Sequence, residues 1–465
     1  MATLTNAMNI GLSGLRANQA GLNVTGHNIS NVNTEGYTRQ QVKLDAAKPV
    51  KLHQGVFGMG VDISSILRYR EESIDRQYRT QNQYLGNLNK QAESMDLIEG
   101  IINEPSETGL QNAIKNLFNS LQDLATNPES SSVRTTVREQ GSALAKMFNQ
   151  VRNQLVEIRE NKNFEILDTV TEINESLDQI GTLNIEIAQT EALGQKANDM
   201  RDSRDNLLDK LSSLIDISAV EDPANSTTIV TITGQAFVVV GNVLHLKSES
   251  TNEEGREYIK ILNPTDNREI EPASGELYGL FEIRDRIIPD LIDQLDELAA
   301  AMITEINAVH RQGYGLKGNR DLAPTNLDFF SGTDAQTMRL SYDLVNDSRN
   351  IAASSSGAPG DNSNALAMAQ LRSAEILNDG TFTFEDFLSG IVSTFGLEAL
   401  SIKEGLANQQ RLVDHLDNYR ESLYGVNMDE ELVGMIRFQQ AFGSCARVIS
   451  TVNELMGVVT QLGRY

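Results

Sequence analysis

Apolar residues near the N-terminus recur at alternating steps of three and four, the spacing of a helix that buries one stripe against another helix. This seam consists of Met8, Leu12, Leu15, Gln19, Leu22, Gly26 and Ile29. Glycine and polar neighbours make the segment weak as an isolated helix, so we expect it to need a partner.

A second seam occupies the C-terminus, with the same spacing over more than three heptads. Its positions are Met435, Phe438, Phe442, Cys445, Ile449, Val452, Met456 and Val459. Asn427, followed by Asp429, Glu430 and Glu431, is typical of a helix start. Two interpretations fit the paired seams: an ordinary intramolecular coiled coil, or termini that stay unfolded until many subunits assemble.

The interior predicts long helices. Heptad steps run from Ile74 to Ile102. Two further seams, Leu144–Ile158 and Ile166–Ile187, are separated by a phase shift without Gly or Pro, which predicts one continuous helix. Another helix is expected after Pro289.

The apolar period changes to two between residues 217 and 275, which predicts strands. The candidate strands are 229–233, 236–240, 243–246 and 258–262. Residues 354–364 read as a loop, after which 365–378 resumes a helical pattern. We therefore expect a mainly α fold of long helices with a small inserted β domain. The predicted domains are a terminal coiled-coil assembly domain (1–45 and 425–465), disordered in the monomer; a long-helix bundle (46–216 and 276–424); and the β domain (217–275).

Charge divides the chain in the same way. The 465 residues carry 39 Lys and Arg against 64 Asp and Glu, for a net charge of −25. Residues 1–70 carry +4 and residues 433–465 carry +2, which leaves −31 for the middle. The acidic balance argues against nucleic acid and anionic membranes as partners. Near-neutral ends can pack closely, whereas the acidic middle stays solvated.

The sequence shows no local signature of catalysis or metal binding. The five histidines are far apart, and the single Cys445 excludes a cysteine-rich metal site. Asp199, Asp202, Asp205 and Asp209 alternate with basic residues, which we interpret as a solvated, ion-paired helix face rather than a calcium loop. We therefore expect no enzyme, no catalytic residue, no cofactor and no metal.

One segment is more specific. Residues 26–40 read Gly-His-Asn-Ile-Ser-Asn-Val-Asn-Thr-Glu-Gly-Tyr-Thr-Arg-Gln. Asn-rich sequence ends helices, and Gly36 can take a positive φ, so we predict a helix end, a tight turn and an extended segment from Tyr37 through Val42 and Leu44. This stretch resembles the N-terminal signature of the bacterial flagellar rod, hook and hook-associated axial proteins.

The C-terminus carries a matching resemblance. Leu423-Tyr-Gly-Val-Asn-Met-Asp-Glu-Glu-Leu432 and Met435-Ile-Arg-Phe-Gln-Gln-Ala-Phe442 are similar to that family's C-terminal signature, and to its hook-associated members in particular. Residues 197–205 and 351–361 agree with these members as well. His27 departs from the pattern, because the family usually has a second Asn there.

The resemblance implies a structural role at the junction between hook and filament, where subunits form a ring required for filament assembly. It implies contacts with hook protein and with a second junction protein or flagellin. It also implies export without a cleaved signal through the flagellar type III apparatus, with a chaperone on the C-terminal seam. The expected assembly residues are Met8, Leu15, Leu22, Asn28, Ile29, Asn31, Gly36, Tyr37, Met435, Phe438, Phe442, Ile449, Val452, Met456 and Val459.

Two alternatives remain open at the level of sequence. One is a hook or rod subunit of the same axial family. The other is a secreted enzyme or adhesin that uses axial-type ends for export, for which 217–275 looks too short to be a catalytic domain.

Overall fold

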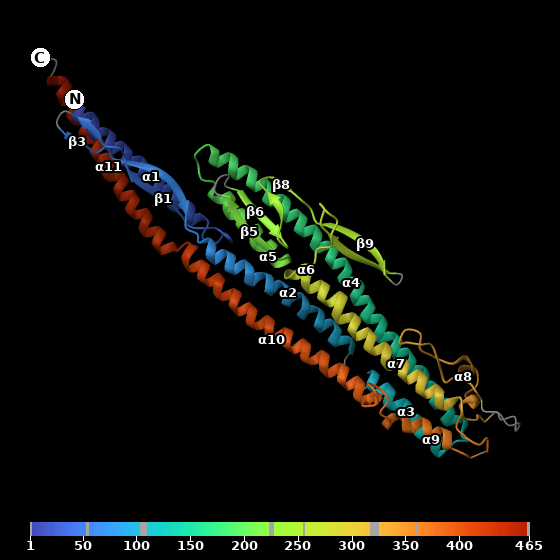
Figure 1. The fold of residues 1–465 in the computed structure, drawn as a ribbon. Coiled ribbons are helices and arrows are strands. Elements are labelled where there is room, and N and C mark those ends of the chain that lie inside the picture. The colour runs from blue at the N-terminus through green and yellow to red at the C-terminus, as the bar shows by residue number, and fades with distance from the viewer. Residues whose placement is uncertain are drawn as a thin grey trace.

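The computed structural model describes residues 2–52, 55–102, 109–222, 227–253, 256–316, 325–358 and 360–462. Long helices run lengthwise along an extended molecule, and both termini lie at one end of it (Figure 1). The helices are α1 (Ala2–Ser30), α2 (Glu72–Ile102), α3 (Leu110–Thr126), α4 (Ser131–Ala192), α5 (Asn198–Leu214), α6 (Gly275–Phe281), α7 (Ile288–His310), α8 (Tyr342–Asn346), α9 (Ser363–Gln370), α10 (Phe384–Tyr424) and α11 (Met428–Leu462).

The strands are short and pair locally. They are β1 (Gln40–Ala46), β2 (Val50–Leu52), β3 (Gly55–Phe57), β4 (Val61–Arg68), β5 (Ile217–Asp222), β6 (Thr227–Ile232), β7 (Gln235–Val239), β8 (Asn242–Val243), β9 (Lys247–Glu253), β10 (Arg256–Leu262), β11 (Phe330–Ser331) and β12 (Arg339–Leu340). The mainly α fold with long helices is confirmed.

The helix α4 is continuous over 62 residues, which confirms that the break between its two seams is a phase shift. Ser130 caps its start by accepting a hydrogen bond from the backbone N–H of Val133. The first half of α4 packs into one core with α3, α7 and α10, where Leu144 and Phe148 are fully buried. The second half belongs to a different core. The phase shift therefore turns one helix toward two cores.

The second core is shared between helices and strands. Ile173 and Leu177 of α4 pack with α5, α6 and residues of the sheet β5-β6-β7-β8 and of β10. All pairings in this region are antiparallel. The strands of 217–275 thus bury their apolar faces against α4 and α5 rather than around a core of their own.

Two expected elements of the body are shorter than the sequence indicated. The strand expected at 243–246 ends at Val243, because the side chain of Asn174 takes over both backbone groups of Leu246 at 2.8 and 3.0 Å. The helix expected at 365–378 ends at Gln370. Asn378 and Asp379 adopt φ of 51° and 59°, left-handed values that form a turn instead. Pro359, in the expected loop 354–364, lies outside the described residues.

The terminal region, which comprises α1, the strands that follow it and α11, includes more of the chain than expected. The strands β1 and β4 pair from Gln40↔Arg68 to Ala46↔Val61 and pack along α1. The Ser13 hydroxyl accepts a hydrogen bond from the backbone N–H of Val61 at 3.2 Å. The chain thus returns to α1 through β4, which ends at Arg68, beyond the boundary predicted at residue 45.

Candidate assembly interface

The two terminal helices pack as an antiparallel pair through glycines. A Cβ atom placed on Gly11 would lie 2.9 Å from Cγ1 of Ile449, one on Gly14 would lie 3.0 Å from Sγ of Cys445, and one on Gly21 would lie 2.6 Å from Cε1 of Phe438. Real Cβ atoms do not approach so closely, so the backbone of α1 lies directly against side chains of α11.

Polar residues continue this line toward the body. Asn18 donates to Sγ of Cys445 at 3.7 Å, and Thr25 approaches Gly434. The line Gly11, Gly14, Asn18, Gly21, Thr25 and Asn28 steps by three and four, and we call it the glycine stripe. It lies about 100° around the helix axis from the predicted apolar seam, as the rotation per residue of an α-helix requires.

The predicted seam of α1 therefore does not supply these close approaches. Met8, Leu15, Leu22 and Ile29 are half-buried, and Leu12 is exposed. On α11 the predicted seam does face α1 at Phe438, Cys445 and Ile449. Val452 is buried, Met435, Phe442 and Met456 are half-buried, and Val459 is exposed.

Asn28 joins the two helices to the first strand with a fully used amide. Its Nδ2 donates to the carbonyl of Gln40 at 3.0 Å and to Oε2 of Glu431 at 3.1 Å. Its Oδ1 accepts from the hydroxyl of Tyr37 at 2.8 Å and from the backbone N–H of Gln40 at 3.1 Å. Two donors and two acceptors are all that an Asn amide offers, so this buried side chain is fully satisfied.

The doubled acid at the start of α11 holds the basic residue of the N-terminal motif. Arg39 donates from Nε to Glu431 at 2.7 Å and from a terminal nitrogen to Glu430 at 3.0 Å. The Asn427 side chain accepts from the backbone N–H groups of Asp429 and Glu430, which confirms the predicted helix start. The N-terminal and C-terminal motifs thus bind each other within one chain.

The turn between α1 and β1 has the predicted form. Gly36 adopts φ of 71°, and a Cβ there would overlap the side chain of Asn206 on α5. Both the backbone conformation and this close approach therefore require glycine. Asn31 closes α1 by donating from Nδ2 to the carbonyl of His27 at 3.0 Å. Burial and the nearby carboxylates, Asp199 foremost, raise the pKa of Tyr37 above its usual value, so its hydroxyl stays protonated for Asn28.

Behind this turn, a buried ion network ties the terminal region to the body. Arg68, at the end of β4, contacts Asp202 at 2.8 Å and Asp205 at 2.6 Å. Asp202 also accepts from the backbone N–H of Thr38 at 3.0 Å. Burial alone raises the pKa of Asp205, but the guanidiniums of Arg70, Arg68 and Arg79 outweigh it and hold this pKa well below the usual range.

The network continues into two long helices of the body. Arg79 of α2 binds Asp209 at 2.7 Å, and Arg420 of α10 binds Asp209 at 2.6 Å and Asp75 at 3.1 Å. The prediction of a solvated, ion-paired face on α5 is therefore wrong for Asp202 and Asp205, which are buried and form ion pairs with arginines outside α5. The prediction failed because the partner arginines come from β4, α2 and α10, far away in the sequence.

The polar groups elsewhere in the described chain do not gather into a metal site. The described residues hold no group of three His, Cys, Asp or Glu side chains arranged for a metal ion. His310 is buried between two backbone groups, the carbonyl of Leu327 at 2.7 Å and the N–H of Ala352 at 3.0 Å. Burial lowers the pKa of His310 to about 4, so it stays neutral. His53 lies outside the described residues. No helix in the described part of the chain combines the length and apolar character needed to cross a membrane.

Sequence comparisons match three parts of the chain. The description "Flagellar hook-associated protein FlgK helical domain" matches residues 95–330, just over half of the chain. Two descriptions of basal body rod proteins match residues 8–38 and 422–462, which contain most of α1 and α11. The rod-type resemblance is thus confined to the terminal helices, and the body carries the hook-associated one.

Full-length relatives agree. The chain is 30% identical to flagellar hook-associated protein 1 of Bacillus subtilis (strain 168), with 96% of each chain covered. It is 24% identical to the protein of that name in Escherichia coli (strain K12), over 99% of this chain and 100% of the other. Its fold matches the flagellar hook junction protein FlgK from Burkholderia pseudomallei with a TM-score of 0.64 and 16% identity, over 75% of this chain and 100% of that one. The chain therefore belongs to the family of flagellar hook-associated protein 1, structural components of the bacterial flagellum.

Proposed function

We propose that this chain is a subunit of the hook–filament junction and that it assembles with copies of itself through its terminal helix pair. The observation that carries the proposal is the division of α1 into two stripes. The glycine stripe is used inside the chain, whereas the apolar stripe of Met8, Leu12, Leu15, Leu22 and Ile29 is left half-buried or exposed. An apolar stripe of this length is typical of a surface that another protein covers.

The outer face of α11 supports the same proposal. Exposed apolar side chains on this face include Leu432, Val433, Ile436, Leu455 and Val458. Contacts between the stripe of one subunit and the outer α11 face of the next would join two different surfaces. Such heterologous contacts build rings and helical arrays rather than closed pairs.

Charge favours the same orientation. The terminal segments are weakly basic and the middle of the chain carries −31. Subunits packed through their ends would keep the mutually repelling acidic bodies apart on the outside. No catalytic step belongs to this role.

The remaining partners follow from the proposed role. Hook protein would lie on one side of the ring, and a second junction protein or flagellin on the other. The subunit would reach this site through the flagellar type III export apparatus without a cleaved signal. A chaperone would then cover the apolar face of α11 until assembly, because exposed apolar helices aggregate.

Deletion of the gene tests the role. We expect bare hooks in electron micrographs and unpolymerised flagellin in the medium. Missing hooks would instead identify a hook or rod subunit. Normal filaments would contradict the proposal altogether and leave an export function for the termini.

Two substitutions on α1 test the surface. Leu22→Glu places a charge on the apolar stripe, and Asn23→Glu places the same charge on the neighbouring exposed position as a control. Both proteins should fold and be exported, but only Leu22→Glu should fail to enter the junction. Normal incorporation of Leu22→Glu would contradict the role of the stripe. Ile436→Glu, on the exposed face of α11, provides an independent second variant.

A further inference from the structure

The segment 197–205, at the start of α5, lies against the turn that follows α1. Its Asp202 accepts a hydrogen bond from the backbone N–H of Thr38 at 3.0 Å, and its Asp199 accepts one from Nε2 of Gln40 at 2.6 Å. Two segments that carry separate sequence signatures therefore bind each other. The proposed contact between subunits makes no use of this segment of α5.

Hydrogen bonds and ion pairs cross the boundary between the terminal region and the body. In the described part of the chain, neither apolar core includes a residue of α1, β1, β4 or α11. Asn198 instead donates from Nδ2 to the carbonyl of Ile66 at 3.0 Å, and the backbone N–H of Arg39 donates to the carbonyl of Tyr424 at 2.9 Å. Hydrogen bonds depend on direction, whereas apolar contacts do not, so these groups fix an angle as well as a contact.

The same boundary fixes the rotation of α1 about its own axis. Three successive residues at the end of this helix point in three directions, because each residue turns an α-helix by about 100°. Nε2 of His27 lies 3.3 Å from Oδ1 of Asp199 on α5, and Asn28 binds Glu431 on α11. The third residue, Ile29, belongs to the apolar stripe. The direction in which the stripe faces is therefore tied to α5.

We propose that α5 positions the terminal helix pair for assembly and that Arg68 is the positioning residue through which it acts. This inference rests on the proposed function and names the groups that orient the surface used there. Arg68 ends β4, and its Nη1 lies 2.8 Å from Asp202 and 2.6 Å from Asp205. Its side chain is 13% exposed, so water screens these ion pairs little and they hold one geometry.

The body supplies a matched control for Arg68. Arg79 of α2 also binds Asp205, at 3.2 Å, together with Asp209 at 2.7 Å, and its side chain is 10% exposed. After the loss of either arginine, Asp205 keeps Arg70 at 3.5 Å. The two arginines thus share a carboxylate and a degree of burial. They differ in what they join, because Arg68 joins the terminal region to the body whereas Arg79 joins two helices of the body.

A distance measurement on the free chain tests the positioning role. Spin labels are placed on Ser450→Cys of α11 and Glu175→Cys of α4, both exposed positions, in a chain in which Cys445, the only cysteine, is replaced by Ser. The parent should give a single narrow distance by pulsed electron spin resonance. Arg68→Met should lose this narrow distance and give a broad distribution. Arg79→Met should keep it, even where its free energy of unfolding falls further.

The conservative variant Arg68→Lys separates charge from packing. Arg68 reaches both aspartates with one nitrogen, so a single ammonium group can take its place between them. Arg68→Lys should therefore recover most of the narrow distance that Arg68→Met loses. A Lys variant as broad as the Met variant would contradict positioning by charge.

Incorporation into flagella gives the functional measurement. The amount of Arg68→Met chain in the junction should fall about tenfold, the order of effect expected from one buried ion pair. Arg79→Met should be incorporated like the parent, and both chains keep the apolar stripe unchanged.

The outcomes separate the two proposals. A broad distance distribution in the parent, or a narrow one in Arg68→Met, would overturn the positioning role and leave the junction role intact. Failure of the parent chain to restore filaments in a deletion strain would overturn the junction role. The distances measured in the free chain do not depend on that result.

Discussion

The body and the terminal pair of this protein are both helical, but they are held together in different ways. In the body, large apolar side chains such as Phe148 and Leu177 are fully buried in two cores. Among the described residues of α1 and α11, the buried apolar side chains are Ala17, Val24 and Val452. Close contact there comes from glycine, and a large share of the apolar surface remains outside.

This difference separates folding from assembly. The cores give the body a large free energy of burial that needs no second copy. The terminal pair gains less from burial within one chain, and in the proposed assembly its exposed stripe would gain more because a neighbour would cover it. The buried arginine–aspartate network joins the two regions at β4, α2, α5 and α10, so the position of the terminal pair is set by the body.

The largest effect is expected on the free energy of unfolding, when one apolar side chain is truncated in each region. Phe148→Ala leaves a cavity in a full core and should lower the free energy of unfolding by about 3–5 kcal/mol. Leu15→Ala removes a half-buried side chain and should cost about 1 kcal/mol or less. Denaturant unfolding of both purified variants measures this. Equal losses would show that the terminal stripe is already buried in the single chain.

The second largest effect is expected on the pH dependence of stability. It is caused by His310, which lies at the end of α7 in the body. Because the folded pKa of His310 is about 4 and its unfolded pKa about 6.5, its stabilising effect is complete above pH 6.5 and is lost as the pH falls toward 4. This loss should reach about 3 kcal/mol. The free energy of unfolding of the His310→Gln variant should fall less over the same pH range. Parallel curves for the two proteins would contradict a neutral buried imidazole.

A smaller effect is expected on the packing of α1 against α11 when either of two glycines of α1 is replaced by alanine. Alanine at Gly21 would press on the ring of Phe438, whereas alanine at Gly26 meets no atom within 4 Å. Gly21→Ala should speed the alkylation of Cys445 about tenfold by loosening the pair. Gly26→Ala should slow it or leave it unchanged, because alanine favours the helix. Equal rates would refute close packing through the glycine stripe.

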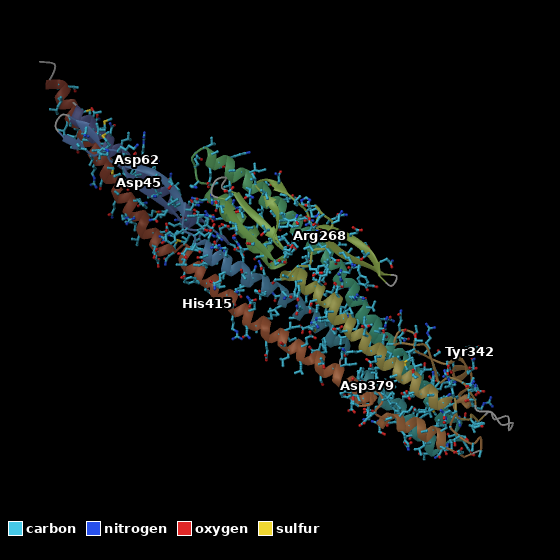
Figure 2. All side chains as sticks on the ribbon, viewed as in Figure 1. Asp45, Asp62, Arg268, Tyr342, Asp379 and His415 are labelled. Atoms are coloured by element: carbon cyan, nitrogen blue, oxygen red, sulfur yellow. The ribbon has the colours of Figure 1, made fainter. Side chains whose placement is uncertain are left out.

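The smallest effect is expected on the stability of the strand pair β1–β4, which carries two like charges opposite each other. Asp45 and Asp62 face each other across β1 and β4 and lie together on the terminal region (Figure 2). Like charges in this position are unfavourable, so Asp45→Asn should stabilise the hairpin by about 0.5 kcal/mol. Hydrogen exchange of the β1 and β4 amides measures this gain. Faster exchange in the variant would mean that the two carboxylates have a stabilising role.

The sequence predicted the helices well because each long helix repeats its apolar spacing many times. The unbroken α4 and the Asn427 helix start are examples, and the positive φ of Gly36 followed from its place in an Asn-rich turn. The end of the helix at Gln370 was missed, because the apolar pattern continued through a turn formed by Asn378 and Asp379.

The candidate site was predicted only in part, for a physical reason. An apolar period identifies which residues avoid water, but it does not say which surface will cover them. Gly11, Gly14 and Gly21 lay at heptad-compatible spacing in the sequence, and a search for small residues as well as apolar ones would have found them. The ion network had no such signal, because Arg68, Asp205 and Arg420 meet only through the fold.

The most direct test of the account is the accessibility of the apolar stripe before and after assembly. Leu22→Cys in a Cys445→Ser chain is labelled with a maleimide, both as free protein and in purified flagella. We predict rapid labelling of the free chain and strong protection in the junction. Leu397→Cys on α10, which lies outside the terminal pair, is the control and should be labelled at the same rate in both states. Equally rapid labelling of Leu22→Cys in both states would contradict the claim that assembly covers this stripe.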